Sequence, residues 1–278
     1  GGYTPPLFAT RQGSLESARL LVAAGADVND TAPMGTSTLV VAALSGQGAV
    51  ATFLLEQGAD PDAADAGYTA LHAAVLRGDL ELVTALLAHG ADPSPQLIRG
   101  TPARRVSADW RLGHNMIGAT PFWLAARFRE PAIMRVLAEG GADPLASKGG
   151  ATAVMAALQG GTTRGRFGIP RADRTEEGRL TIAAVEQALE AGADVDSTND
   201  GGDTALHIAA SRGLDDVITL LAARGATLDV RNERGQTPLG VAIAGPQGVS
   251  ALYNPGGGRP STVALLRELG ATDEGTPR

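Results

Sequence analysis

The chain has 278 residues, of which 44% are hydrophobic and 19% are charged, and its net charge is −7; this composition is typical of a folded protein rather than of a disordered segment. It contains no cysteine, which excludes disulfides, thiolate metal sites and a thiol nucleophile. The acidic balance disfavours nucleic acid as a partner, because neutralised phosphates supply most non-specific affinity. No apolar run reaches the ~18 residues that a membrane span needs.

Two short motifs alternate along the chain. The first is a threonine or serine before an apolar stretch, and it occurs at Thr4, Ser37, Thr69, Thr120, Thr152, Thr204 and Thr237. The second is Gly-Ala-Asp or a close relative, and its glycines are Gly25, Gly58, Gly90, Gly141, Gly192, Gly225 and Gly270. In five of the seven copies the two motifs lie 21 residues apart, and the period of 32–33 residues indicates a repeat array.

The pattern of each copy predicts two short helices joined by a tight turn. Threonine followed by proline, as in Thr4-Pro5, is typical of an N-cap with proline at the first helical position. A glycine that supplies the left-handed backbone of a turn follows the first helix at Gly13, Gly46, Gly78 and Gly213. The second helix has apolar residues at helical spacing, for example Leu82, Val83, Leu86 and Leu87. Helices this short are unstable alone, so neighbouring copies must stack to bury them.

This pattern resembles the ankyrin repeat. The most similar copies are Gly67-Tyr-Thr-Ala-Leu-His-Ala-Ala, ending at His89-Gly-Ala-Asp, and Gly202-Asp-Thr-Ala-Leu-His-Ile-Ala-Ala, ending at Arg224-Gly-Ala-Thr. The resemblance implies an all-α ankyrin-repeat solenoid of about seven helix-turn-helix units with finger turns between them, used for protein binding and almost never for catalysis. We expect one array over residues 1–272, with units starting near residues 2, 35, 67, 118, 150, 202 and 235, and a polar C-terminal tail over 273–278.

Three intervals are too long for the period, which predicts insertions near residues 93–117, 160–179 and 246–260. The first two carry net charges of +3 and +2, and each combines clustered arginines with an aromatic residue, a composition common in partner anchors. The alternative is that both are solvated loops outside the stacked core. The third insertion is nearly uncharged and has the composition of a spacer. In the fourth unit Arg129 replaces the turn glycine, and we expect the turn to reshape, with Pro131 beginning the second helix, rather than Arg129 adopting the left-handed conformation.

Catalytic, cofactor and metal sites are not predicted. His72 and His207 occupy the threonine-x-leucine-histidine position of the repeat, where the resemblance implies a hydrogen bond to the threonine. His89 ends a second helix and His114 lies in the first insertion, so no two histidines share a helix face. No paired carboxylates and no nucleophile–base pair support an enzyme.

The sequence therefore predicts a non-enzymatic scaffold that binds another protein through finger tips, the concave helix face and the basic insertions. The alternative is a regulatory or targeting region of a larger multidomain protein, one that could itself be enzymatic. The candidate partner-binding residues are Tyr68, Arg77, Arg104, Arg105, Trp110, Arg111, Arg127, Phe128, Arg164, Arg166, Asp203, Arg212, Arg231 and Glu233. For the arginines at helix ends, the competing interpretation is capping of the helix carbonyls.

The source and context of the chain are indicated only by its composition and its start. Twenty-two of the 23 basic residues are arginine, which suggests a bacterium with a GC-rich genome. The absence of cysteine and of an initiating methionine favours an exported bacterial protein over a cytoplasmic one. Because the chain starts at a repeat boundary, we expect further repeats or domains N-terminal to Gly1.

Overall fold

The computed structural model describes residues 2–101, 112–161, 173–245 and 259–272. This described part contains fourteen α-helices, one 3-10 turn and one two-stranded hairpin, which confirms the expected helical repeat fold. The chain divides into two compact units: unit 1 comprises the described residues up to Asp143, and unit 2 comprises Pro144–Gly161 and the described residues from Asp173 onward. The expectation of a single array over residues 1–272 stays a prediction.

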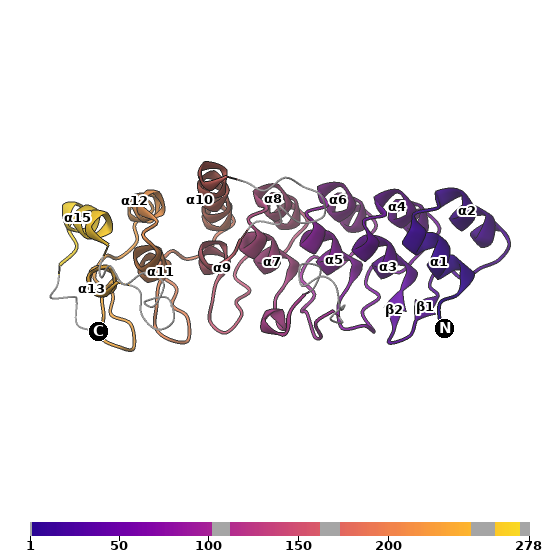
Figure 1. Ribbon diagram of the computed structural model, residues 1–278, viewed down its shortest axis with the longest axis horizontal. Helices are drawn as coiled ribbons and strands as arrows, with labels where there is room; N and C mark the ends of the chain where they lie inside the picture. The colour runs from indigo at the N-terminus through magenta and orange to yellow at the C-terminus, as the bar shows by residue number, and fades with distance from the viewer. Residues whose placement is uncertain (1, 102–111, 162–172, 246–258, 273–278) are drawn as a thin grey trace. The chain divides into compact units, whose positions relative to one another are not determined.

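Unit 1 is a double layer of four helix pairs (Figure 1). The first helices of the pairs, packed side by side, are α1 (Pro5–Gln12), α3 (Thr38–Ser45), α5 (Ala70–Arg77) and α7 (Pro121–Phe128). The second helices, which form the other layer, are α2 (Leu15–Ala23), α4 (Gly48–Glu56), α6 (Leu80–Ala88) and α8 (Pro131–Glu139). The first helices lie deepest: α5 is buried from Ala70 to Leu76, whereas α6 buries only Leu82, Val83 and Leu86. Apolar stacking of the inner layer therefore supplies the core.

Unit 2 repeats the same arrangement with three helix pairs. The pairs are α9 (Ala153–Gln159) with α10 (Arg174–Glu190), α11 (Ala205–Arg212) with α12 (Asp215–Ala223), and α13 (Pro238–Ala244) with α15 (Pro260–Glu268). Helix α10 has 17 residues against nine in α12, and Asp173 caps its N-terminus. The expected insertion over 160–179 is thus partly wrong as a loop, because its last six residues extend a helix.

The predicted N-caps form at most first helices. The Ser37 hydroxyl accepts a hydrogen bond from Val40 N at 3.2 Å, and the Thr120 hydroxyl accepts one from Trp123 N at 3.3 Å. The cap expected at Thr4 is wrong: its hydroxyl makes no capping bond and donates instead to the carboxylate of Asp30. The proline pair after Thr4 leaves two of the orphan amides of the first turn without a hydrogen to donate.

Four of the turns between paired helices follow the glycine prediction, and one turn in unit 1 departs from it. Gly13, Gly46, Gly78 and Gly213 all have left-handed backbone, with φ between 68° and 73°. In the fourth pair, Arg129 takes the same conformation at φ 58° and ψ 51°, and Pro131 begins α8 as expected. The expectation that Arg129 avoids this region is wrong. The turn geometry is imposed by packing of the two helices, at a cost of about 1–2 kcal/mol for a residue with a Cβ.

Within each unit, side chains of the fingers connect neighbouring repeats in a ladder of hydrogen bonds. Backbone N–H groups near the Gly-Ala-Asp motif donate to a side chain of the preceding repeat, as Asp60 N does to Asn29 Oδ1 at 2.8 Å and Thr227 N does to Asp196 Oδ1 at 2.9 Å. The bond from Asp143 N to Ser94 Oγ at 2.9 Å spans 49 residues. The ladder therefore keeps its register across the first insertion. The finger between the first two pairs also forms a hairpin, with β1 (Thr31–Ala32) antiparallel to β2 (Thr36–Ser37).

The ends of the first insertion are part of the folded core of unit 1. Leu97 and Leu112 are fully buried, and Leu97 exchanges backbone hydrogen bonds with Gly118 and Ala119. A 3-10 turn, η1 (His114–Met116), follows. The alternative of a solvated loop outside the stacked core is therefore wrong for the two ends of this insertion. Residues 102–111 between them lie outside the described part.

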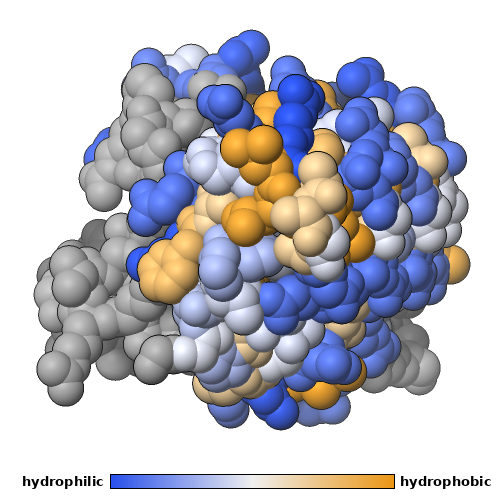
Figure 2. Space-filling view, turned by 90° about the vertical axis from the view of Figure 1, so that its right-hand side faces the viewer, coloured by the Kyte–Doolittle hydropathy of each residue, from blue (hydrophilic) through white to orange (hydrophobic). Residues whose placement is uncertain are grey.

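One end of unit 1 exposes apolar side chains. Figure 2 faces the end that carries α1 and α2 and shows hydrophobic residues gathered among hydrophilic ones. Phe8 on α1 is 53% exposed and Leu20 on α2 is 67% exposed. The positions equivalent to Phe8 in the next two first helices, Val41 and Ala73, are buried. In the described residues α1 has a first helix beside it on one side only, namely α3.

Candidate functional site

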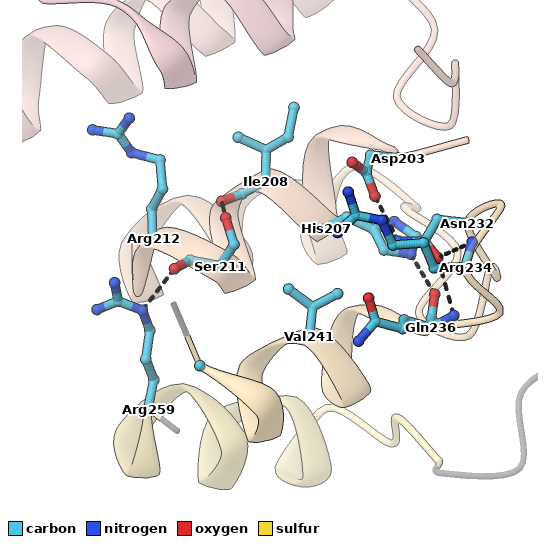
Figure 3. Close-up of a pocket in the computed structure, with 11 residues that line it drawn as sticks. Asp203, His207, Ile208, Ser211, Arg212, Asn232, Arg234, Gln236, Val241 and Arg259 are labelled. Carbon is cyan, nitrogen blue, oxygen red and sulfur yellow. Dashed lines mark hydrogen bonds between the residues drawn. The ribbon is translucent and has the colours of Figure 1, made fainter. Parts of the chain in front are cut away.

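A hollow of about 490 Å³ opens in unit 2 between α11, α13 and the fingers that precede them (Figure 3). Its middle is lined by the apolar residues Ile208 of α11 and Val241 of α13, and its two ends are polar. The residues that line it are Asp203, His207, Ile208, Ser211, Arg212, Asn232, Arg234, Gln236, Val241, Gly245 and Arg259. The site follows from the repeat, because α11 and α13 are consecutive first helices. Equivalent positions of the two repeats therefore lie beside one another.

At one end of the hollow, two arginines lie near the C-terminus of α11. Arg259 donates from Nε to the carbonyl oxygen of Ser211 at 2.8 Å, and Arg212 projects at the same end (Figure 3). A cation at this place complements the partial negative charge of the last helix carbonyls. Gly213 lies beneath it with left-handed backbone, and a Cβ there would lie 2.9 Å from Arg259 Cδ. The same device occurs in unit 1, where Arg77 donates to Leu44 O at 3.0 Å.

At the other end, the finger before α13 is held by one buried asparagine. Asn232 donates from Nδ2 to Asp203 Oδ1 at 2.8 Å and accepts at Oδ1 from Arg234 N and Gln236 N, both at 3.0 Å. His207 is fixed to the same finger through Nε2, 3.0 Å from Gln236 O. These bonds tie the finger to α11. The side chain of Arg234 is left exposed at the rim.

His207 and His72 have the structural role that the repeat implies. In both, Nδ1 accepts a hydrogen bond from the backbone N–H of the capping threonine, at 3.1 Å from Thr204 N and 3.2 Å from Thr69 N. Burial lowers the pKa of His207 below its ordinary value, and the Gln236 carbonyl opposes that shift only in part. Burial lowers the pKa of His72 to about 4. Both imidazoles are therefore neutral at pH 7 and act as structural caps.

Two of the predicted contact residues are not on the surface. Tyr68 is 3% exposed and Phe128 is 2% exposed, so the expectation that they face a partner is wrong. Tyr68 directly precedes the capping threonine Thr69 and is packed into the core with it. Phe128 ends α7, where the left-handed turn at Arg129 directs the chain back over the core.

The remaining predicted contacts divide by position. Arg77 is half-buried as a cap on α3, and Arg127 is half-buried with its guanidinium 5.9 Å from the ring centre of Trp123. Asp203 and Arg212 line the hollow, and Arg231 and exposed Glu233 belong to the finger at its edge. Those that fall outside the described residues are Arg104, Arg105, Trp110, Arg111, Arg164 and Arg166.

Several lining residues were not among those predicted. Asn232, Ser211 and Ile208 carry no motif that separates them from ordinary repeat positions. Arg259 is the main omission, since it lies in the insertion over 246–260 that was interpreted as a spacer. The spacer interpretation is wrong for Arg259, because this residue caps α11 from 48 positions away in sequence, whereas residues 246–258 lie outside the described part. The sequence signal for Arg259 is a basic residue directly before Pro260, the proline that begins α15.

The described ranges show neither a metal site nor a membrane span. They contain no group of three or more His, Cys, Asp or Glu side chains placed to hold a metal ion. Nor does any helix in them combine the length and the apolar character that a bilayer crossing requires.

The comparison with known families agrees with this geometry. A family model described as ankyrin repeats (3 copies) matches residues 7–97 and 176–261, which is more than half of the chain. The chain therefore belongs to the ankyrin-repeat family, and ankyrin repeats are protein–protein interaction modules.

Individual relatives match parts of the chain. Over 152 residues, 49% of its length, the chain is 38% identical to ankyrin repeat and SOCS box protein 18 of Homo sapiens, of which it covers 33%. Over 108 residues, 38% of its length, it is 34% identical to protein fem-1 homolog A of Danio rerio, of which it covers 16%. The chain thus spans a third or less of these relatives. They are eukaryotic, and the bacterial source expected from composition stays a prediction.

Solved structures match almost the whole chain. The ankyrin repeat domain of human ASB11 superposes with a TM-score of 0.68 and 25% identity, covering 99% of this chain and 100% of that one. The ankyrin repeat domain of Bcl-3 superposes with a TM-score of 0.65 and 22% identity, covering 96% and 99%. The second likeness shows the fold alone.

Proposed function

We propose that this chain is a non-enzymatic scaffold that binds a partner protein through the fingers and first helices of unit 2. The observation that carries the proposal is the hollow between α11 and α13, which combines an apolar middle with charged side chains at both ends. A protein surface of mixed polarity is the chemistry that such a lining complements. Exposed Glu233 and Arg234 extend the same surface onto the finger.

The absence of cysteine makes a direct test possible. A photocrosslinker attached to a single introduced cysteine at Glu233→Cys should capture a partner from an extract of the native organism. The matched control is Glu190→Cys, an exposed position at the end of second helix α10. Crosslinks to one protein from position 233 but not from 190 are expected. Equal capture from both positions, or capture from 190 alone, would remove the proposed surface.

The two basic insertions form a second proposed contact region. Its support is compositional: Arg104, Arg105 and Arg111 lie beside Trp110, and Arg164 and Arg166 lie in a second run of net positive charge. Replacing the first three arginines by serine should weaken partner binding, more so at low salt, without changing the melting temperature. If affinity for a captured partner is unchanged in this variant and in one with Arg164 and Arg166 replaced by serine, the insertions are not contacts.

A second candidate function is a regulatory or targeting region within a longer protein. It is favoured by the apolar end of unit 1, where Phe8 and Leu20 are exposed, since a further repeat or domain would cover such a face. The relatives, one of which is named for a SOCS box in addition to its ankyrin repeats, are longer than this chain. The test is to express the chain together with any coding sequence that precedes it in the gene. The α1 and α2 amides should then exchange hydrogen more slowly than in the chain alone. Unchanged exchange there would reject this covering role.

A further inference from the structure

The lining of the hollow in unit 2 has the opposite sign to the molecule that contains it. Arg212, Arg234 and Arg259 line it against a single carboxylate, that of Asp203. The carboxylate is already an acceptor for Asn232 Nδ2 at 2.8 Å, within the finger. The chain as a whole has a net charge of −7. A ligand of this hollow therefore meets a locally positive surface on an acidic protein.

The two arginines at the α11 end have donors available to a ligand. Among the described residues, Arg212 is exposed and makes no hydrogen bond or ion pair. Arg259 uses Nε on Ser211 O, which holds the guanidinium in place, and its two terminal nitrogens make no hydrogen bond or ion pair among the described residues. A planar guanidinium whose position is already held matches a carboxylate with two parallel hydrogen bonds and loses little entropy on binding.

The middle of the hollow adds a second requirement. Ile208, which is 7% exposed, and half-buried Val241 line the hollow between its polar ends and supply its aliphatic lining (Figure 3). A free anion would leave this surface uncovered. An aliphatic side chain adjacent to an acidic one covers it and satisfies the arginines together, within a volume of about 490 Å³ that suits a few residues.

We propose that the hollow between α11 and α13 binds an extended acidic peptide segment of the partner, with an Asp or Glu side chain on Arg212 and Arg259 and a neighbouring Leu, Ile or Val over Ile208 and Val241. The proposal rests on the proposed scaffold function, because it specifies the partner chemistry of that surface. It commits to a peptide rather than a nucleic acid, because an acidic chain repels a polyanion overall and the aliphatic surface has no use for a phosphate.

The probe is a display library of random octapeptides selected against the full chain. Selected peptides should be enriched in Asp or Glu within two positions of an aliphatic residue. For a selected peptide, Arg212→Ser should raise Kd by roughly tenfold, as expected for loss of a charge-assisted hydrogen bond. The matched control Arg135→Ser removes an exposed arginine of α8, outside the hollow, and should leave Kd unchanged. Arg212→Glu should select lysine-containing peptides instead.

Melting curves of Arg212→Ser and Arg135→Ser should lie close to that of the parent chain, since Arg212 makes no hydrogen bond or ion pair among the described residues and loses only a weak interaction with the helix carbonyls. Any of three outcomes would overturn the peptide proposal. These are selected peptides without acidic residues, an equal change of Kd in Arg212→Ser and Arg135→Ser, or no selected binder. Partner crosslinks at Glu233→Cys combined with any of these outcomes would leave the scaffold function standing. Loss of those crosslinks would reject the scaffold function separately.

Discussion

His72 should make the stability of unit 1 sensitive to mild acid. The side chain is fully buried, its Nδ1 accepts from Thr69 N, and its Nε2 has no hydrogen-bond partner in the described residues. Burial lowers its pKa from 6.5 to about 4, with the Ala119 and Pro95 carbonyls and the Asp92 carboxylate opposing part of the effect. Protonation would place a charge in the core and would remove the acceptor that completes the cap on α5.

The direction of the effect follows from proton linkage. Since the unfolded chain binds the proton near pH 6.5 and the folded chain only near pH 4, the contribution of His72 to stability is complete above pH 6.5 and is lost as the pH falls toward 4. From pH 7 to pH 5 the loss from this one residue is about 2 kcal/mol. His207 changes stability in the same direction, because its pKa is also lowered by burial.

The assay compares the parent chain with His72→Gln by chemical denaturation at pH 7 and pH 5. Glutamine at this helix position can accept from the Thr69 N–H and does not titrate, so it retains the cap while removing the proton. We expect the parent to lose about 2 kcal/mol more than the variant on acidification. Hydrogen exchange of the α5 amides should report the same difference locally. Equal acid sensitivity of the two proteins would refute the assignment of the effect to His72.

Three other predictions concern the turns, the ladder and metal independence. Gly213→Ala should lower the free energy of unfolding by about 1–2 kcal/mol because its backbone is left-handed. It should lose about 1 kcal/mol more because the new Cβ displaces Arg259 from Ser211 O. Gly225→Ala, whose Cβ would have nothing within 4 Å, should show only the first loss. Denaturation in an Arg259→Ala background should abolish the difference, and its persistence would contradict the role given to Arg259. Ser94→Ala should cost about 0.5–1.5 kcal/mol and speed exchange of the Asp143 amide, while unchanged exchange would show that the ladder bond carries no stability. Thermal melts with and without chelator should coincide, since stacking and caps stabilise the repeats; a large drop with chelator would reveal a structural metal.

The sequence by itself determined the repeat and most of its local structure. Threonine caps, turn glycines and the threonine–histidine pairs act within four residues of one another, so Thr204 with His207 could be read from the chain without knowledge of its neighbours. The period then implied stacking, because helices of eight or nine residues cannot bury their apolar faces alone.

Only the tertiary structure decided which side chains face a partner. Tyr68 and Phe128 occupy positions that the repeat pattern marks as contacts, but packing against the neighbouring helices buries them. Arg129 adopts the left-handed conformation that glycine has in the other turns, although its Cβ disfavours it. Arg259 reaches Ser211 from 48 residues away, and the hollow exists only where α11 and α13 lie side by side. Such contacts depend on distances between repeats, which local sequence patterns do not encode.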